Sequence, residues 1–307
     1  MLRYALLRVL GAIPTLLLVI VLAFLMVHAA PGGPFDVERP MPPEIQKALE
    51  AAYGLDQPIY VQLWRYLSSV VRGDFGPSYH YVGYSVTELI RGTFPVSLLL
   101  GGVAILVAVL AGVTSGTLAA LRRNSVLDRL LMGIAMTGIS VPVFVVAPIL
   151  VLVFAVKLHW LPAGWAGSEG LARLVLPVIA LALPQIAYIA RLTRAGMIEV
   201  LASDYIRTAR AQGLGTAAIV RYHALRPAFV PVLSYLGPAI AAILTGAVVI
   251  EEVFGIPGLG ELFVRAAGNR DYLVVLGVVV LYAVLVVALN LAVDILYGVI
   301  DPRVRSR

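Results

Sequence analysis

Residues 273–300 read LVVLGVVVLYAVLVVALNLAVDILYGVI, an apolar run that contains a single charged side chain, Asp294. A helix needs about 20 such residues to cross the hydrocarbon core of a membrane, because each residue adds about 1.5 Å. Other runs of this kind lie along the chain, so the sequence predicts an all-α polytopic membrane protein with six transmembrane helices. The predicted spans are 9–30, 95–121, 130–156, 174–190, 228–250 and 273–300.

The overall composition supports this class. Of 307 residues, 61% are hydrophobic and 13% charged, and the mean hydropathy is +0.95, far from the balance of a soluble domain. The first run is longer than the core of a cleavable signal peptide, so we interpret it as an anchor helix. The fourth run is short and contains Pro177 and Pro184, which a membrane helix tolerates when its neighbours satisfy the freed backbone groups. No cysteine occurs, which excludes disulfide and thiol chemistry.

The distribution of arginine and lysine predicts the orientation. Basic residues in 1–8, 122–129, 191–226 and 301–307 are more than twice as dense as in 31–94, 157–173 and 251–272. Because basic loops stay on the cytoplasmic side, we expect both termini in the cytoplasm. The net charge of +6 then reflects topology, and no nucleic-acid partner is expected.

The segment 31–94 between the first two spans is expected to form a small extracytoplasmic helical subdomain. Pro43 can begin one amphipathic helix and a second follows Pro58, since apolar residues recur there at helical spacing. Residues 73–79, GDFGPSY, read as a tight turn. Two roles remain open: a packed lid over the helices, or a surface that touches substrate.

Several enzyme signatures are missing. A P-loop needs Gly-Lys-Ser/Thr, whereas the only lysines, Lys47 and Lys157, follow Gln and Val. No histidine is followed by Glu, so the zinc-peptidase helix is excluded. Ser115 lies between Gly112 and Gly116, which we interpret as a small-residue helix contact. We therefore expect no catalytic site, no metal site and no bound cofactor in this chain.

An ion-coupled carrier would need titratable groups at depth in the membrane. The candidates are Asp294 and, near the outer boundary, His28, Glu251 and Glu252. Asp294 lies about two helical turns from Asp301, so a structural role near the inner interface is the preferred interpretation.

Residues 191–227 form the most elaborate inner segment. Its first part continues the fourth span as a helix, and Asp204 is expected to cap a short helix, Tyr205 to Ala211, that ends at Gly213. With Ala209 small enough for close approach, this helix could dock in a groove of a partner. An amphipathic helix on the lipid surface is the equal alternative.

This segment carries a family resemblance. DYIRTARAQGL (204–214) and HALRPA (223–228) resemble the ATPase-contacting loop of ABC importer permeases in its peptide-transporter form. Arg207, Thr208 and Ala209 occupy the places of Glu-Ala-Ala in the general pattern, and Gly213 matches its glycine. The resemblance extends through APG (30–32), YGLDQP (53–58), FPVS (94–97), EEVFGIPGLG (251–260) and DPRVR (301–305). It is closest to the B-type permease subunit of bacterial oligopeptide importers, with dipeptide and nickel importers next.

The resemblance implies a type I ABC importer permease fold, with an N-terminal helix at 1–30, the subdomain at 31–94 and a permease core at 95–307. It implies a bacterial inner-membrane complex with a second homologous permease, two cytoplasmic ATPases that bind ATP and Mg, and an extracytoplasmic peptide-binding protein. Oligopeptides would enter the cytoplasm by alternating access. The implied ATPase-coupling residues are Asp204, Tyr205, Arg207, Thr208, Ala209, Arg210, Gly213 and His223.

Three other classes stay open: an ion-coupled carrier, an intramembrane protease using Ser115 or Ser140 with His28, and a structural membrane protein. The importer hypothesis predicts that Gly213→Glu uncouples transport without preventing insertion. It also predicts that a cysteine at Ala209 or Gly213 crosslinks to an ATPase subunit.

Overall fold

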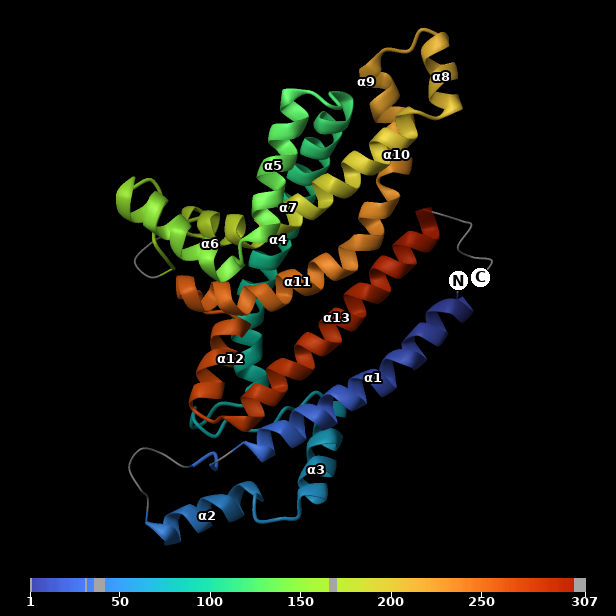
Figure 1. Cartoon of the computed structure of the whole chain (residues 1–307). Coiled ribbons are helices and arrows are strands. Elements are labelled where there is room, and N and C mark those ends of the chain that lie inside the picture. Colours follow the sequence, from blue (N-terminus) through green and yellow to red (C-terminus); the bar gives the residue numbers. More distant parts are fainter. Residues whose placement is uncertain (1, 31, 36–41, 166–169, 301–307) are drawn as a thin grey trace. The chain divides into compact units, whose positions relative to one another are not determined.

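The computed structural model describes residues 2–30, 32–35, 42–165 and 170–300. The described chain is helical, with one isolated antiparallel bridge between Pro77 and Ser85 and no strand. Figure 1 labels the helices along the chain. The first are α1 (Leu2–Ala29), α2 (Pro43–Tyr53), α3 (Ile59–Val71), α4 (Val86–Leu121), α5 (Val126–Ser140), α6 (Val143–Leu150) and the π-helix η1 (Val151–Lys157). Then follow α7 (Ala172–Leu201), α8 (Asp204–Ala211), α9 (Thr216–Ala218), the π-helix η2 (Ile219–Ala224), α10 (Leu225–Ala228), α11 (Val230–Phe254), α12 (Leu259–Gly268) and α13 (Tyr272–Ile300).

Five helices of the described chain are long and apolar enough to cross a membrane, in α1, α4, α7, α11 and α13. The third predicted span, 130–156, differs from the prediction because it is no single helix: α5 and the helix after it are bent by 108°. Pro142 causes the break, since a residue before proline is forced out of the helical region, and Val141 is extended (φ −98°, ψ 121°). The count is six only if this bent pair is one span.

Other sequence expectations for the helices are confirmed. The fourth run becomes the 30-residue α7, with Pro177 and Pro184 inside it, and the helix continues past Arg191 as expected. The helices after Pro43 and Pro58 are α2 and α3, and Pro43 occupies the first turn of α2. The side chain of Asp294 lies outside the described residues, as does all of Asp301.

The chain divides into two compact units, which we describe separately. Unit 1 comprises Met1–Leu7, Leu98–Ile256 and Val286–Arg307, and unit 2 comprises Arg8–Ser97 and Pro257–Leu285. Unit 2 therefore combines most of α1, the segment that follows it and the start of α4 with α12 and the first half of α13, which are distant in sequence.

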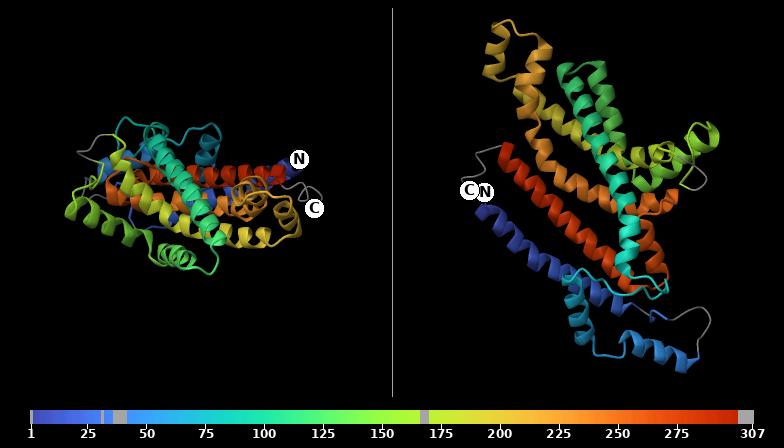
Figure 2. Two further views of the ribbon diagram at one scale, coloured as in Figure 1. Left: turned by 90° about the horizontal axis from the view of Figure 1, so that it is seen from above. Right: turned by 180° about the vertical axis from the view of Figure 1, so that it is seen from behind.

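In unit 1, α7 is the central helix and packs against α5, α6, α10 and α11. Figure 2 gives two further views of these helices. Glycines allow the closest approaches: a Cβ on Gly112 would lie 2.7 Å from Cβ of Ile189, and one on Gly116 would lie 2.8 Å from Cβ of Thr193. The small residues around Ser115 thus form a contact between α4 and α7, as the sequence predicted.

Unit 2 is built around two apolar clusters. Val86 and Ile90 of α4 pack with α12 and α13, while Phe24 of α1 and Tyr66 of α3 pack with Leu276 of α13. These clusters hold the segment 73–85, which has no regular structure, against helices.

Candidate functional site

The predicted coupling segment folds as a helical hairpin within unit 1. Helix α8 packs against η2 and the end of α7, and Figure 1 shows α8 beside the α9 end of this hairpin. The helix begins after Ser203, whose backbone is extended (φ −72°, ψ 157°). Ser203, not Asp204, therefore occupies the N-cap, which corrects the sequence expectation. Asp204 instead lies in the first turn, where a carboxylate interacts favourably with the helix dipole.

The inner face of α8 carries Ile206 and Ala209, which are 0% and 5% exposed. They pack with Met197 of α7 and with Ile219 and Ala224 of η2. Burying an aliphatic side chain of this size contributes about 2 kcal/mol. The hairpin is therefore held to the rest of unit 1 by its own apolar core.

This packing revises the role expected for Ala209. Its small side chain permits close approach within the chain, and it is not available at the surface for a partner. The residues that are exposed are Tyr205, Arg207, Thr208, Arg210, Gly213 and His223, together with Asp204. Of the predicted coupling residues, only Ala209 is buried.

The exposed face has few internal contacts. Arg207 pairs with Asp204 (Nη1 to Oδ1, 3.2 Å), and both side chains are largely in solvent, where such a pair contributes little to stability. The Tyr205 hydroxyl lies 3.5 Å from the carbonyl oxygen of His223, at the limit of a hydrogen bond. These side chains are free to engage another surface.

The C-terminus of α8 is capped by backbone hydrogen bonds. The amide of Gly213 donates to the carbonyl of Arg210 (3.0 Å), and the amide of Leu214 donates to the carbonyl of Ala209 (3.2 Å). This pair of bonds is the Schellman motif, which requires a left-handed residue after the C-cap. Gly213 supplies it with φ +86°.

A buried ion pair lies elsewhere in unit 1. The Arg194 guanidinium donates to both oxygens of Asp128 (Nε to Oδ1, 2.6 Å; Nη2 to Oδ2, 2.7 Å), and the Asp128 side chain is 4% exposed. The amide of Asp128 donates to Ser125 Oγ (3.2 Å), and the amide of Asn124 donates to the Asp128 carboxylate (2.9 Å). This clamp joins the start of α5 to α7, the helix that leads into the coupling hairpin.

Sequence reasoning missed this clamp. The spacing of Ser125 and Asp128 is a capping-box signal that could have located the start of α5. The partner, Arg194, is 66 residues away, and only tertiary structure identifies it.

The geometry does not support a serine protease or a metal site. Ser115 Oγ donates to the carbonyl of Ala111 (2.7 Å) and Ser140 Oγ to that of Met136 (2.9 Å), so both hydroxyls are engaged within their own helices. In the part of the chain that the structure describes, no group of three His, Asp or Glu side chains could hold a metal ion.

Two family models cover nearly the whole chain. Residues 112–306 match the binding-protein-dependent transport system inner membrane component, and residues 1–100 match the N-terminal part of membrane components of such systems.

Curated relatives match over their full length. The oligopeptide transport system permease protein of Escherichia coli K12 is 51% identical over 305 residues, covering 99% of this chain and 100% of the relative. The dipeptide transport system permease protein of Bacillus subtilis is 45% identical, covering 99% and 98%. The glutathione transport system permease protein of Salmonella paratyphi A is 41% identical, covering 100% of both.

Solved structures share the fold. A chain of the MetNI methionine ABC transporter in an inward-facing conformation superimposes with a TM-score of 0.57 at 19% identity, over 69% of this chain and 96% of that chain.

Proposed function

The chain belongs to the family of binding-protein-dependent transport system inner membrane components, and on that premise we propose how it takes part in peptide import. It is a multi-pass membrane permease subunit of an ABC-type peptide importer. The observation that carries this conclusion is 51% identity over 99% of the chain to an oligopeptide permease. Oligopeptides are favoured over dipeptides because the dipeptide relative is less similar, at 45%.

In this proposal the chain forms half of a pathway with a second, homologous permease. Six spans, counting the bent pair of α5 and residues 143–157 as one, place both termini in the cytoplasm and the segment 31–94 outside. An extracytoplasmic peptide-binding protein delivers the substrate there. The domain division is an anchor helix at 1–30, the subdomain at 31–94 and a permease core at 95–307.

Two ATPase subunits bind ATP and Mg, and they dock on the exposed face of α8. The buried side chains Ile206 and Ala209 support this role, because they couple α8 mechanically to α7. When the ATPases close, the hairpin transmits their motion to α7 and thus to the transmembrane helices. The chain itself performs no catalysis, and its function is to move peptides by alternating access.

The test is uptake of a labelled oligopeptide by the complete complex in proteoliposomes. We expect uptake with ATP, none with a non-hydrolysable analogue, and no loss when an uncoupler removes ion gradients. Uptake that persists without ATP hydrolysis but collapses with the uncoupler would identify an ion-coupled carrier instead.

A further inference from the structure

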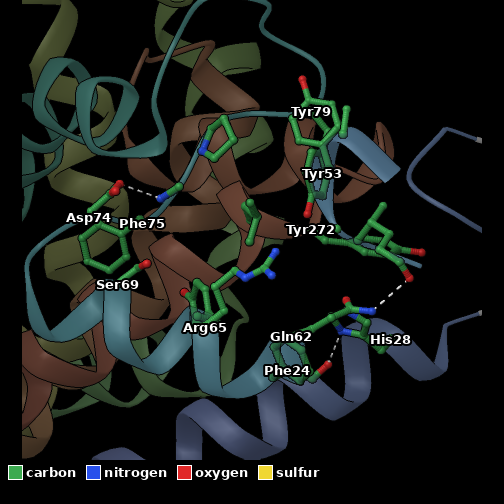
Figure 3. A pocket seen from close by; sticks show the side chains of 17 residues that line it. Phe24, His28, Tyr53, Gln62, Arg65, Ser69, Asp74, Phe75, Tyr79 and Tyr272 are labelled. Atoms are coloured by element: carbon green, nitrogen blue, oxygen red, sulfur yellow. Dashed lines mark hydrogen bonds between the residues drawn. The ribbon is translucent and has the colours of Figure 1, made fainter. Parts of the chain in front are cut away.

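Unit 2 contains a cavity of about 290 Å³ between α1, α2, α3 and the segment 73–79, and Tyr272 at the start of α13 also lines it. This volume lies near the lower end of the range for small-ligand sites, about 300 Å³. Figure 3 shows the Arg65 side chain extending among the aromatic residues that line it. All lining residues belong to unit 2.

The cavity has aromatic walls. Tyr53 and Tyr79 meet edge to face with ring centroids 5.0 Å apart, and Phe24 stacks on His28 at 4.0 Å. Such walls suit an apolar or aromatic side chain of a ligand.

Among the described residues that line the cavity, Arg65 is the one arginine or lysine. The Arg65 guanidinium forms no ion pair and no hydrogen bond with the described residues. It lies so close to Gly54 that a Cβ there would collide with Nη1. The backbone also favours glycine here, because φ is +68°. The absence of a side chain at Gly54 leaves the space that the guanidinium occupies.

A second donor is also unused. The hydroxyl of Tyr66 is buried and has no hydrogen-bond partner, although the residue lines the cavity and is only 6% exposed. Burial raises the pKa of Tyr66 well above its usual range, so the hydroxyl stays a neutral donor. Leaving a buried polar group unpaired costs about 1–3 kcal/mol, and a ligand oxygen would remove that cost.

Two polar side chains beside these donors, Gln62 and Asp74, are engaged within the chain. Gln62 Nε2 donates to the carbonyls of Leu55 (3.0 Å) and Gln57 (2.8 Å), and Gln62 Oε1 lies 3.2 Å from His28 Nε2. Asp74 accepts from the amide of Gly76 (2.9 Å). The Arg65 guanidinium and the Tyr66 hydroxyl therefore keep donors that a ligand oxygen can accept.

From this geometry we propose that the cavity binds the C-terminal end of a short peptide, with the α-carboxylate on Arg65 and the Tyr66 hydroxyl and the last side chain against the aromatic lining. Arginine suits a carboxylate because its planar donors match two oxygens at once. The space accommodates about one residue and its carboxylate. The peptide identity of the ligand rests on the proposed function, whereas the carboxylate chemistry rests on the cavity alone.

The test is binding of the dipeptide Ala-Phe to the assembled complex in lipid nanodiscs, without ATP and without the binding protein, by titration calorimetry. Its C-terminal amide, Ala-Phe-NH₂, is the matched ligand without the carboxylate. We expect the amide to bind tenfold or more weakly, because a hydrogen-bonded charge is worth about that factor.

Two substitutions probe the two donors. Arg65→Gln should weaken Ala-Phe binding tenfold or more, and Tyr66→Phe about three- to tenfold. Tyr66→Phe should not lower the thermal stability, because it removes a hydroxyl that has no partner. The controls are Tyr60→Phe on α3 and Arg72→Gln at its C-cap, whose side chains do not line the cavity and should leave binding unchanged.

Absence of Ala-Phe binding, equal binding of the amide, or binding unaffected by both Arg65→Gln and Tyr66→Phe would overturn the proposal. ATP-driven oligopeptide uptake by the same preparation is measured separately. Uptake without cavity binding refutes this site alone, whereas cavity binding without ATP-driven uptake refutes the transport function and leaves the site standing.

Discussion

Gly213 shows how one residue can combine a backbone requirement with a proposed contact. It adopts φ +86°, and a Cβ at this position would meet no atom within 4 Å. A substitution is therefore strained by the backbone and not by crowding, at a cost of about 1 kcal/mol for most residues. The predicted effect of Gly213→Glu would mix this strain with added charge.

A cleaner pair is Gly213→Asn and Gly213→Asp, because both side chains tolerate the left-handed region and they differ mainly in charge. We expect Gly213→Asn to retain most uptake and Gly213→Asp to reduce uptake and ATPase stimulation, at equal amounts of protein in the membrane. If the two variants transport equally well, Gly213 does not face the ATPase.

The ion pair of Asp128 and Arg194 carries a stability prediction. Asp128→Ala leaves a partly buried guanidinium without its acceptors, which should lower the free energy of unfolding by about 2 kcal/mol. Thermal unfolding of the purified complex measures the effect. The matched control is Arg207→Ala, which breaks a solvent-exposed pair with Asp204 and should lower the unfolding temperature far less. Equal effects of the two substitutions would show that the clamp does not stabilise the fold.

At the scale of the element, α8 is an amphipathic helix whose apolar face is already covered by its own chain. That packing argues against the alternative that α8 lies on the lipid surface, because such a helix needs its apolar face free for the membrane. The polar face is the one left for a partner.

Cysteine crosslinking can test this face, because the chain has no native cysteine. Thr208→Cys and Ala211→Cys lie on the exposed side of α8 and should crosslink to a co-expressed ATPase subunit in a way that changes with ATP. Ala209→Cys is the control, because its site is 5% exposed and it should crosslink weakly or not at all. Stronger crosslinking at Ala209 than at both exposed positions would mean that α8 leaves its core when the complex assembles.

The segment 73–85 illustrates a second element held by distant residues. The buried carboxylate of Asp271, which precedes α13, accepts hydrogen bonds from the Ser78 hydroxyl and from the amides of Tyr79 (3.2 Å) and His80 (3.1 Å). Burial, and to a smaller extent the charge of this carboxylate, raises the pKa of Tyr79. A loop without regular structure is therefore fixed by one side chain nearly 200 residues away.

For the whole molecule, the predicted orientation of the chain in the membrane can be tested at two exposed positions. Val82 is 88% exposed and Tyr222 is 69% exposed, and they lie in segments that the basic residues predict on opposite sides. Val82→Cys in spheroplasts should react with a membrane-impermeant maleimide, whereas Tyr222→Cys should react only after permeabilisation. The reverse pattern would invert the topology, and labelling of both before permeabilisation would contradict the span count.

Hydrophobic runs and motifs were sufficient to predict the family, which the comparisons confirm, and most of the helices. The physical reason is that hydrocarbon length and backbone hydrogen bonding leave a membrane chain few alternatives to a helix of about 20 residues. Local signals also predicted α2, α3 and the end of α8, because proline at a first turn and glycine at a left-handed position act within a few residues.

Tertiary structure decided what depends on contacts between distant residues. The direction in which Ala209 points is set by its packing on Met197 and Ile219. Arg194, the partner of Asp128, comes from α7, and the donors to Asp271 come from the segment 73–85. The bend at Pro142 has a local cause. The apolar residues on both sides of it nevertheless led to the prediction of one continuous span, because composition does not register the bend. The cavity around Arg65 exists only because α1, α2, α3 and α13 converge in unit 2, and no spacing along the chain encodes that meeting.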